Sequence, residues 1–393
     1  MLKKRASFFG VNMIYFDNAA TTKVRPEVIE SMLPVLSEEY GNPSSLYAMG
    51  RSAHSLIEKA RKQVASAIGA KLPREIFFTS CGTESDNWAI TGAMALAKGK
   101  HMITSMVEHH AVLYTCERLE EQGFSVTYIK PDETGRITAE AVAKEIREDT
   151  ALISIMYANN EVGTVNEIAA IGKLAREHCI LFHTDAVQAA GHLPIDVEAE
   201  NIDLLSISAH KFHAPKGVGA LYIRDGVNIA KLMRGGAQER NQRPGTENTA
   251  SIVAMGTALS LAVSEMPEET ARIGAMREHL EKRIFAEIPD VYLNGNREHR
   301  LPGTLNLRFP GAGSDAVLLS LDMEGLAASG GSACSAGAAE ASHVLLAMGL
   351  SESEAKHSIR LSLGHLNTME EVDQAVEILK RVVLRIRSIS PVY

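Results

Sequence analysis

The chain has 393 residues, of which 45% are hydrophobic, and a formal net charge of −8. Its length exceeds that of one ordinary domain, and its hydrophobic share is that of a globular protein with a sizeable core. The negative charge argues against a nucleic-acid-binding protein, because such proteins carry a surplus of Lys and Arg. No apolar run approaches the roughly 18 to 20 residues of a membrane span, so we expect no membrane association.

The cysteines and the N-terminus suggest a cytoplasmic protein. Four cysteines, at 81, 116, 179 and 334, form neither a CxxC pair nor a zinc-binding spacing, so no metal site is expected. Isolated cysteines in a chain of this size are typical of the reducing cytoplasm. Residues 1–13 resemble a signal peptide only faintly, since Asn12 interrupts their apolar run, and we expect a disordered N-terminal extension.

Strands and helices are expected to alternate from residue 14 to about 257. Helices are predicted from Pro26 and over 51–68. The predicted strands are continuous apolar runs at 76–79, 102–105, 126–129, 151–156, 180–184, 204–208 and 218–223. Helical patterns between such runs predict an α/β fold with a mostly parallel, doubly wound, seven-stranded sheet whose two faces are covered. We assign residues 14–257 to this large domain.

The pattern changes in the last third of the chain. Helices are predicted at 248–264 and 267–287, short strands at 304–309 and 359–363, and a closing helix at 369–387. This order indicates a smaller α+β domain over residues 258–393, and the first residues after the extension could pack with it.

Lys211 is the first candidate for a catalytic group. It follows the predicted strand 204–208 in the segment Ser208-Ala209-His210-Lys211. Open α/β sheets build their ligand sites at the carboxyl ends of strands, and a lysine held there can act as a Schiff-base nucleophile. Taken alone, the segment also fits a lysine in a surface loop.

Asp185 favours the catalytic interpretation. It closes the predicted strand 180–184, and Gln188 stands three residues further on. A Schiff-base lysine combined with an aspartate for a pyridinium nitrogen is typical of pyridoxal phosphate sites. A buried aspartate also needs a cationic partner, which the ring nitrogen would supply, while Gln188 could reach the ring hydroxyl oxygen.

Three further segments fit such a site but also have simpler interpretations. Gly82 and Thr83 stand between a strand and a helix, where N–H groups and a hydroxyl can bind phosphate, although they also suit an ordinary helix start. His109 could stack on a planar cofactor and move protons, or be structural. Asn160 could bind a phenolate oxygen or a substrate carboxylate, or form a turn.

Two residues near the C-terminus complete the set of candidates. Cys334 lies in a run of small residues from 327 to 339, which cannot pack a core and is expected to be a mobile loop carrying one thiol. Arg360 lies in the predicted strand 359–363 and could clamp an amino-acid carboxylate with two hydrogen bonds. The alternative for Arg360 is a surface ion pair.

In this order the motifs resemble those of the cysteine desulfurases, fold-type-I pyridoxal-phosphate enzymes of the class V aminotransferase group. The resemblance extends from about residue 14 to the C-terminus. The Ser-Gly-Gly-Ser-Ala-Cys loop is similar to that of the subgroup serving iron–sulfur cluster assembly, nitrogenase or tRNA thiolation. The matching segments are Tyr15-Phe16-Asp17-Asn18-Ala19-Ala20-Thr21-Thr22, Gly41-Asn42-Pro43-Ser44-Ser45, Thr79-Ser80-Cys81-Gly82-Thr83-Glu84-Ser85, Glu108-His109, Asn159-Asn160-Glu161, Asp185-Ala186-Val187-Gln188, Ser208-Ala209-His210-Lys211, Arg243-Pro244-Gly245-Thr246 and Ser332-Ala333-Cys334.

The resemblance implies an activity and a role for each matched residue. L-cysteine would be converted to L-alanine, and its sulfur would pass as a persulfide on the catalytic Cys334 to an iron–sulfur scaffold or another acceptor protein, with transient cluster contact through Cys334 as an option. Lys211 would carry the cofactor and His109 would stack on it as acid and base. The remaining implied cofactor contacts are Asp185 at the ring nitrogen, Gln188 and Asn160 near the ring oxygen, and Gly82, Thr83, Ser208, His210 and Thr246 at the phosphate.

Two further implications concern the substrate and the assembly. Asn42, Asn160 and Arg360 would bind the substrate carboxylate. Thr246 would reach the phosphate of the other subunit, which implies a homodimer. The sequence departs from the family pattern at Cys81, where glycine is common, at His365, where arginine is frequent, and after Cys334, where a proline is missing.

Two rival interpretations remain open. Another pyridoxal-phosphate enzyme of the same fold, such as an aminotransferase or a selenocysteine lyase, would share the cofactor site but an aminotransferase needs no thiol at Cys334. A non-catalytic scaffold for assembly partners would have no need of the set Lys211, Asp185 and His109.

Overall fold

The computed structural model describes residues 7–8, 11–330 and 341–389. The strands are β1 (Ser7–Phe8), β2 (Val11–Asn12), β3 (Ile14–Tyr15), β4 (Ile76–Thr79), β5 (His101–Ser105), β6 (Ser125–Ile129), β7 (Thr150–Ser154), β8 (Leu181–Asp185), β9 (Leu204–Ser208), β10 (Gly219–Ile223), β11 (Tyr292–Asn294), β12 (Thr304–Arg308), β13 (Leu326–Ala327) and β14 (Ser358–Ser362). The helices are α1 (Pro26–Ser37), α2 (Ala48–Ala67), α3 (Gly82–Leu96), α4 (His110–Glu121), α5 (Ala139–Ala143), α6 (Ile168–Glu177), α7 (Gln238–Asn241), α8 (Thr249–Glu287), α9 (Ser314–Met323), α10 (His343–Ala347), α11 (Glu352–Ala355) and α12 (Met369–Ile389), with 3₁₀ turns η1 (Pro73–Glu75) and η2 (Ala209–Lys211).

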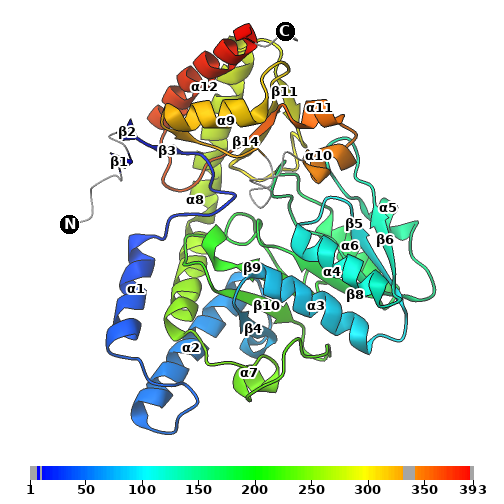
Figure 1. The fold of residues 1–393 in the computed structure, drawn as a ribbon. Helices are drawn as coiled ribbons and strands as arrows, with labels where there is room; N and C mark the ends of the chain where they lie inside the picture. Colours follow the sequence, from blue (N-terminus) through cyan, green and yellow to red (C-terminus); the bar gives the residue numbers. More distant parts are fainter. Residues whose placement is uncertain (1–6, 9–10, 331–340, 390–393) are drawn as a thin grey trace.

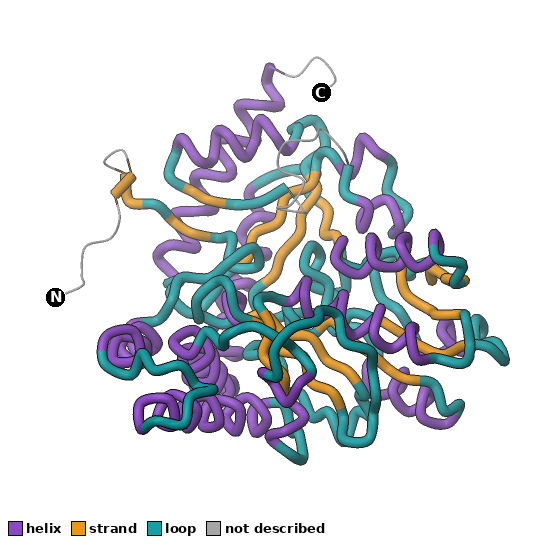
Figure 2. Tube along the Cα trace, turned by 60° about the horizontal axis from the view of Figure 1, so that its bottom comes forward, coloured by secondary structure: helices purple, strands orange, loops and turns teal. Residues whose placement is uncertain are grey.

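A seven-stranded sheet in the order β4-β10-β9-β8-β7-β5-β6 forms the centre of the molecule (Figures 1 and 2). Strand β10 runs antiparallel to β4 and β9, and the other neighbouring strands are parallel. The predicted seven-stranded, mostly parallel sheet is therefore confirmed, and each strand lies within about two residues of its expected position.

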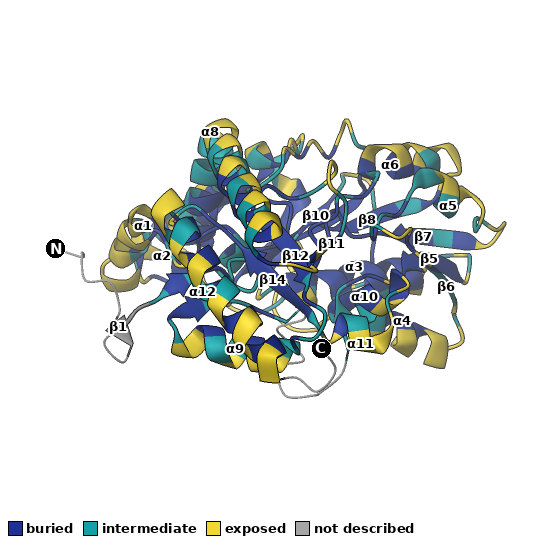
Figure 3. Ribbon diagram, turned by 90° about the horizontal axis from the view of Figure 1, so that it is seen from above, coloured by how far each residue is buried: buried dark blue, intermediate teal, exposed yellow. Residues whose placement is uncertain are grey.

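Alternation of side chains explains why both faces of this sheet are buried. Successive strand residues point to opposite faces, so apolar pairs such as Phe77 and Phe78 supply two cores. One core lies under α3 and α4 and the other under α2, α6 and the first part of α8. Figure 3 shows the buried sheet between helices whose outer sides are exposed.

A second sheet, β11-β12-β14, has a hydrophobic core of its own. All its pairs are antiparallel, and α9, α12 and the second part of α8 pack on it. Ile14 and Phe16 belong to this core, and β3 pairs with β13. Ile14 and Phe16 thus pack with residues of the C-terminal third of the chain. Ahead of them, β1 pairs with β2, where a disordered extension had been expected.

Helix α8 corrects the prediction of two helices at 248–264 and 267–287. It is continuous over 39 residues and includes Pro267. Its first part packs in the large core through residues such as Leu259, and its second part packs in the smaller core through residues such as Leu280, so packing on both sides overrides the proline. The predicted domain boundary at 257/258 falls inside this helix and stays a prediction.

Helix α8 is also the one described helix that is long and apolar enough to cross a membrane by length and composition. Of the most apolar 18-residue stretch of this helix, 50% is buried inside the protein. It packs against α1, α2 and α12 (Figure 1), which is the environment of a core helix.

Candidate active site

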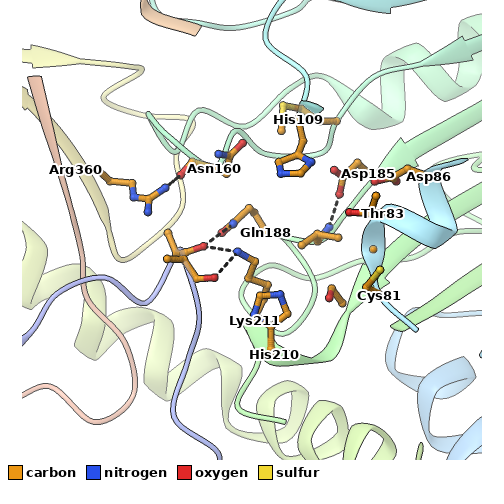
Figure 4. Close-up of a pocket in the computed structure, with 16 residues that line it drawn as sticks. Cys81, Thr83, Asp86, His109, Asn160, Asp185, Gln188, His210, Lys211 and Arg360 are labelled. Atoms are coloured by element: carbon orange, nitrogen blue, oxygen red, sulfur yellow. Dashed lines mark hydrogen bonds between the residues drawn. The ribbon is translucent and has the colours of Figure 1, made fainter. Parts of the chain in front are cut away.

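A cavity of about 230 Å³ lies at the carboxyl ends of the parallel strands, where open α/β sheets bind ligands (Figure 4). It brings together ten of the residues that the sequence predicted. They are Gly82, Thr83, His109, Asn160, Asp185, Gln188, Ser208, His210, Lys211 and Arg360.

Lys211 is held in place by main-chain carbonyls. It ends the 3₁₀ turn η2, directly after β9, and its Nζ donates to the carbonyl oxygens of Ala19 at 2.6 Å and Ala20 at 2.9 Å. Gln188 Nε2 donates to the same Ala19 oxygen at 3.0 Å. The segment after β3 therefore forms one wall of the cavity and fixes the position of the amine.

Asp185 presents a buried carboxyl group to the cavity. It is the last residue of β8 and 5% exposed, and its Oδ1 accepts the Val187 N–H at 2.9 Å. Burial raises the pKa of Asp185 to about 6, while the Val187 N–H and the charge of Lys211 oppose this shift. A cation bound next to Asp185 would favour its ionised form.

His109 caps the first turn of α4. Its Nδ1 accepts the Ala111 N–H at 3.1 Å, so in the neutral ring the proton lies on Nε2. Burial, together with the charge of Lys211, lowers the pKa of His109 to about 4. The ring is therefore neutral near pH 7, and Figure 4 shows it pointing into the cavity.

The start of α3 provides backbone donors for an anion. Helix α3 has 15 residues and begins at Gly82, so the N–H groups of its first turn lack partners within the helix. A Cβ atom on Gly82 would lie 2.7 Å from Val187 Cγ2 and 3.4 Å from Ser208 Cβ. Glycine is therefore required by close packing, as expected for a phosphate-binding turn.

Arg360 is almost fully buried, at 1% exposure, and already has two partners. Its Nη1 donates to the Asn160 carbonyl at 2.7 Å, and its Nη2 donates to Asp17 Oδ1 at 2.8 Å. Its backbone also bridges to Ser329, which precedes the segment carrying Cys334. The guanidinium therefore joins β14, the Asn160 loop and the residues after β3 at one point of the cavity.

Two predicted residues that the structure describes, Asn42 and Thr246, do not line the cavity. Asn42 is exposed, and its Oδ1 accepts the Ser44 N–H at 3.0 Å. Thr246 is exposed in the loop whose Arg243 forms an ion pair with Glu84 at 2.7 Å. Cys334 lies outside the described residues.

The cavity also contains residues that the sequence analysis did not assign. Asp86, Met156, Val187 and the pair Ala19 and Ala20 line it, and Cys81 lies there as well, half-buried at the start of α3. Helical spacing from Thr83 was the available signal for Asp86, because residues three apart share a face of a helix. No local pattern indicated Ala19 and Ala20, which take part through their carbonyl groups.

A mostly parallel seven-stranded sheet with a lysine and an aspartate at its strand ends defines a fold-type-I enzyme. The family model described as aminotransferase class-V matches residues 14–375, and the chain belongs to this family.

Similar sequences are described as cysteine desulfurases. Cysteine desulfurase IscS of Dictyoglomus turgidum is 50% identical over 380 residues, which cover 96% of each chain. Cysteine desulfurase IscS of Methanosarcina thermophila is 50% identical over 381 residues, covering 96% of this chain and 94% of its own. The solved structure of a NifS-like protein has a TM-score of 0.89 and 38% identity, covering 95% of this chain and 100% of its own. The solved structure of SspA in complex with cysteine has a TM-score of 0.79 and 42% identity, covering 89% of this chain and 98% of its own.

Proposed function

We propose that this protein is a cysteine desulfurase that converts L-cysteine to L-alanine and passes the sulfur, as a persulfide on Cys334, to an acceptor for iron–sulfur cluster assembly or thiolation. The observation that carries the proposal is the meeting of Lys211, Asp185, His109 and Arg360 in one cavity. The family membership and the descriptions of similar proteins support it.

The residues of the cavity fit pyridoxal phosphate. Asp185 is a buried carboxyl without an ion pair to Lys or Arg among the described residues, and a protonated ring nitrogen would supply its cation. The first turn of α3 with Thr83, together with Ser208 and His210, suits the phosphate group. When bound, the cofactor supplies an electron sink for the electrons left at the substrate Cα.

The protein's own side chains would hold the cofactor in place and transfer protons. Lys211 is the amine that would attach the cofactor and later move the proton at the substrate Cα. His109 holds a proton at Nε2 and is neutral near pH 7, so it can exchange protons with substrate or thiol groups. Asp185 and Gln188 would fix the ring from its two polar edges.

The buried Arg360 would bind the substrate carboxylate. Asp17 already balances part of its charge, so the carboxylate would join an existing ion pair rather than meet an isolated cation. Asn160 would lie beside it, because the Asn160 carbonyl accepts from the same guanidinium. Asn42 would take part only after a rearrangement of its exposed loop.

The sulfur-transfer step requires a thiolate at Cys334. An ordinary cysteine thiol has a pKa of about 8.5 and is mostly protonated at neutral pH, so its proton must pass to a base, and His109 is our candidate. The Cys334 thiolate would then attack the substrate Sγ and the Cβ–Sγ bond would break, leaving the electron pair with the substrate carbons. A proton added at Cβ would complete alanine, while the outer sulfur stays on Cys334 as a persulfide.

We also propose a homodimer in which Thr246 reaches the phosphate of the other subunit. In the described chain Thr246 is exposed and does not line its own cavity, which supports this proposal. The Arg243–Glu84 ion pair at 2.7 Å holds this loop close to the start of α3.

The deciding experiment compares wild type with Cys334→Ala. We expect the variant to release alanine from L-cysteine more than about 10³-fold more slowly and to form no protein-bound persulfide, because the nucleophile is gone. With L-selenocysteine it should keep more activity, since selenium leaves more readily. Cys179→Ser, which removes an exposed thiol ahead of β8, is the matched control and should behave as wild type.

Two results would overturn the assignment of the nucleophile. Undiminished desulfuration by Cys334→Ala would point to Cys81 or to a lyase mechanism. Equal loss on both substrates would mean that this segment shapes the pocket rather than attacking sulfur.

A further inference from the structure

Asp86 is a second buried carboxyl at the Asp185 end of the cavity. It lies on α3, one turn after Gly82 and Thr83, and is 1% exposed. Asp86 lines the cavity, and Figure 4 shows its side chain next to that of Asp185. Its Oδ1 has no hydrogen-bond partner within the described residues. A buried carboxylate in this situation would carry a large desolvation cost.

The histidine beside Asp86 does not supply a balancing charge. His183 Nε2 lies 3.7 Å from Asp86 Oδ1, and its two ring nitrogens are hydrogen-bonded to the hydroxyls of Ser154 at 2.8 Å and Ser206 at 3.1 Å. The ring is fully buried, and burial lowers the pKa of His183 to about 3. His183 is therefore neutral at physiological pH.

The other titratable groups that act on Asp86 favour its neutral form. The negative charges of Asp185, Glu108 and Cys81 each raise the pKa of Asp86. No Lys or Arg of the described chain forms an ion pair with Asp86. Burial and then the charge of Asp185 raise the pKa of Asp86 well above its ordinary value, while the Ser206 hydroxyl opposes this shift.

The two carboxyls differ in what stabilises a negative charge. Asp185 accepts a backbone N–H from Val187 and lies within the influence of the Lys211 cation. The stabilising group identified for Asp86 is the Ser206 hydroxyl, a neutral donor. When two neighbouring carboxyls cannot both ionise, the proton stays on the less stabilised one, which here is Asp86.

We propose that Asp86 is a positioning residue, held as the neutral acid, whose carboxyl proton is donated toward Asp185 so that Asp185 remains the one ionised carboxylate facing the cavity. The inference rests on the proposed function, because it gives Asp185 the task of holding the ring nitrogen protonated. A neutral donor stabilises the Asp185 charge without adding a cation that would compete with the ring.

The protonation state of Asp86 can be measured on the cofactor-free protein. Infrared spectroscopy in D₂O near pH 7.5 should detect neutral carboxyl groups in wild type, and Asp86→Asn should lose one component of this band. Glu108→Gln is the matched control: burial raises the pKa of Glu108 to about 8, so it should remove a different component and leave that of Asp86.

The effect on Asp185 can be measured by visible titration of the loaded protein. Asn retains an N–H donor, so Asp86→Asn should titrate within about 0.3 unit of wild type, whereas Asp86→Ala should shift the midpoint by about one unit because Asp185 loses a donor. An unchanged infrared band in Asp86→Asn would mean that Asp86 is ionised, and an unshifted titration in Asp86→Ala would mean that it does not reach Asp185; either overturns the proposal. A protein that gives the expected spectra but releases no alanine from cysteine would refute the proposed function alone.

Discussion

Arg360 donates to the carboxylate of Asp17 at 2.8 Å, and this ion pair connects β14 to the segment that follows β3. The Arg360 side chain is 2% exposed and that of Asp17 is 20% exposed, so the pair is largely shielded from water. Asp17 therefore lowers the cost of keeping a guanidinium in the cavity before any substrate carboxylate arrives.

Asp17→Asn should weaken the fold and strengthen substrate binding. Removing the charge leaves a buried guanidinium with only neutral partners, so we expect the free energy of unfolding to fall by about 2 kcal/mol, discounted for the partial exposure of Asp17. The freed charge should lower KM for L-cysteine a few-fold. Denaturant unfolding and steady-state kinetics measure the two effects. Asp225→Asn, which breaks an exposed pair with Arg74, is the control and should change neither quantity.

Lys211→Ala should lose the visible absorption of lysine-bound cofactor. The Lys211 amine is held by the Ala19 and Ala20 carbonyls at 2.6 and 2.9 Å, which places it for attachment. The control is Lys216→Ala, an exposed lysine of the same loop, which should keep the full absorption band. An unchanged band in Lys211→Ala would identify another lysine as the attachment point.

His213→Asn should reduce the loss of stability in acid. His213 is 5% exposed, and burial lowers its pKa to about 4 although its Nδ1 contacts the Lys23 carbonyl at 2.9 Å. An unfolded histidine has a pKa of about 6.5, so below that pH the unfolded chain binds a proton that the folded chain excludes. His213 therefore does not lower the free energy of unfolding above pH 6.5, and it lowers this free energy progressively as the pH falls from 6.5 toward 4.

For His213 the loss between pH 8 and pH 5 amounts to about 2 kcal/mol. Asn fits the backbone here, because residue 213 has a positive φ of 67° and Asn tolerates that conformation. Denaturant unfolding of both proteins at the two pH values measures the difference. Parallel loss in wild type and variant would show that other groups account for the acid sensitivity.

The sequence predicted the parts of the site that lie at strand ends, because a strand that ends in a polar residue is a local pattern. Asp185 and Lys211 were found in this way. Asp17 as the partner of Arg360 was not, since 343 positions separate the two and their contact depends on how the second sheet packs. The sequence also predicted two helices in place of α8, because local propensity favours a break at Pro267. Packing of α8 in two cores, which the local sequence does not reveal, keeps the helix continuous.

Gly82→Ala should weaken cofactor binding by crowding the start of α3. The added Cβ would lie 2.7 Å from Val187 Cγ2. Val187 is β-branched, so its side chain cannot easily rotate away from this contact. The first turn of α3 must then shift, which moves its N–H groups away from the phosphate. We expect about a tenfold loss of pyridoxal phosphate affinity, measured by fluorescence titration of the cofactor-free protein.

Two companion variants test this explanation directly. In Gly82→Ala combined with Val187→Ala the clash is removed, so most of the affinity should return. Gly274→Ala, in the middle of α8 with no atom within 4 Å of the new Cβ, should leave affinity unchanged and add about 0.5–1 kcal/mol of stability, as alanine does inside a helix. If the double variant binds as poorly as Gly82→Ala alone, contact with Val187 is not the cause, and the glycine is needed for direct approach of the phosphate to the backbone.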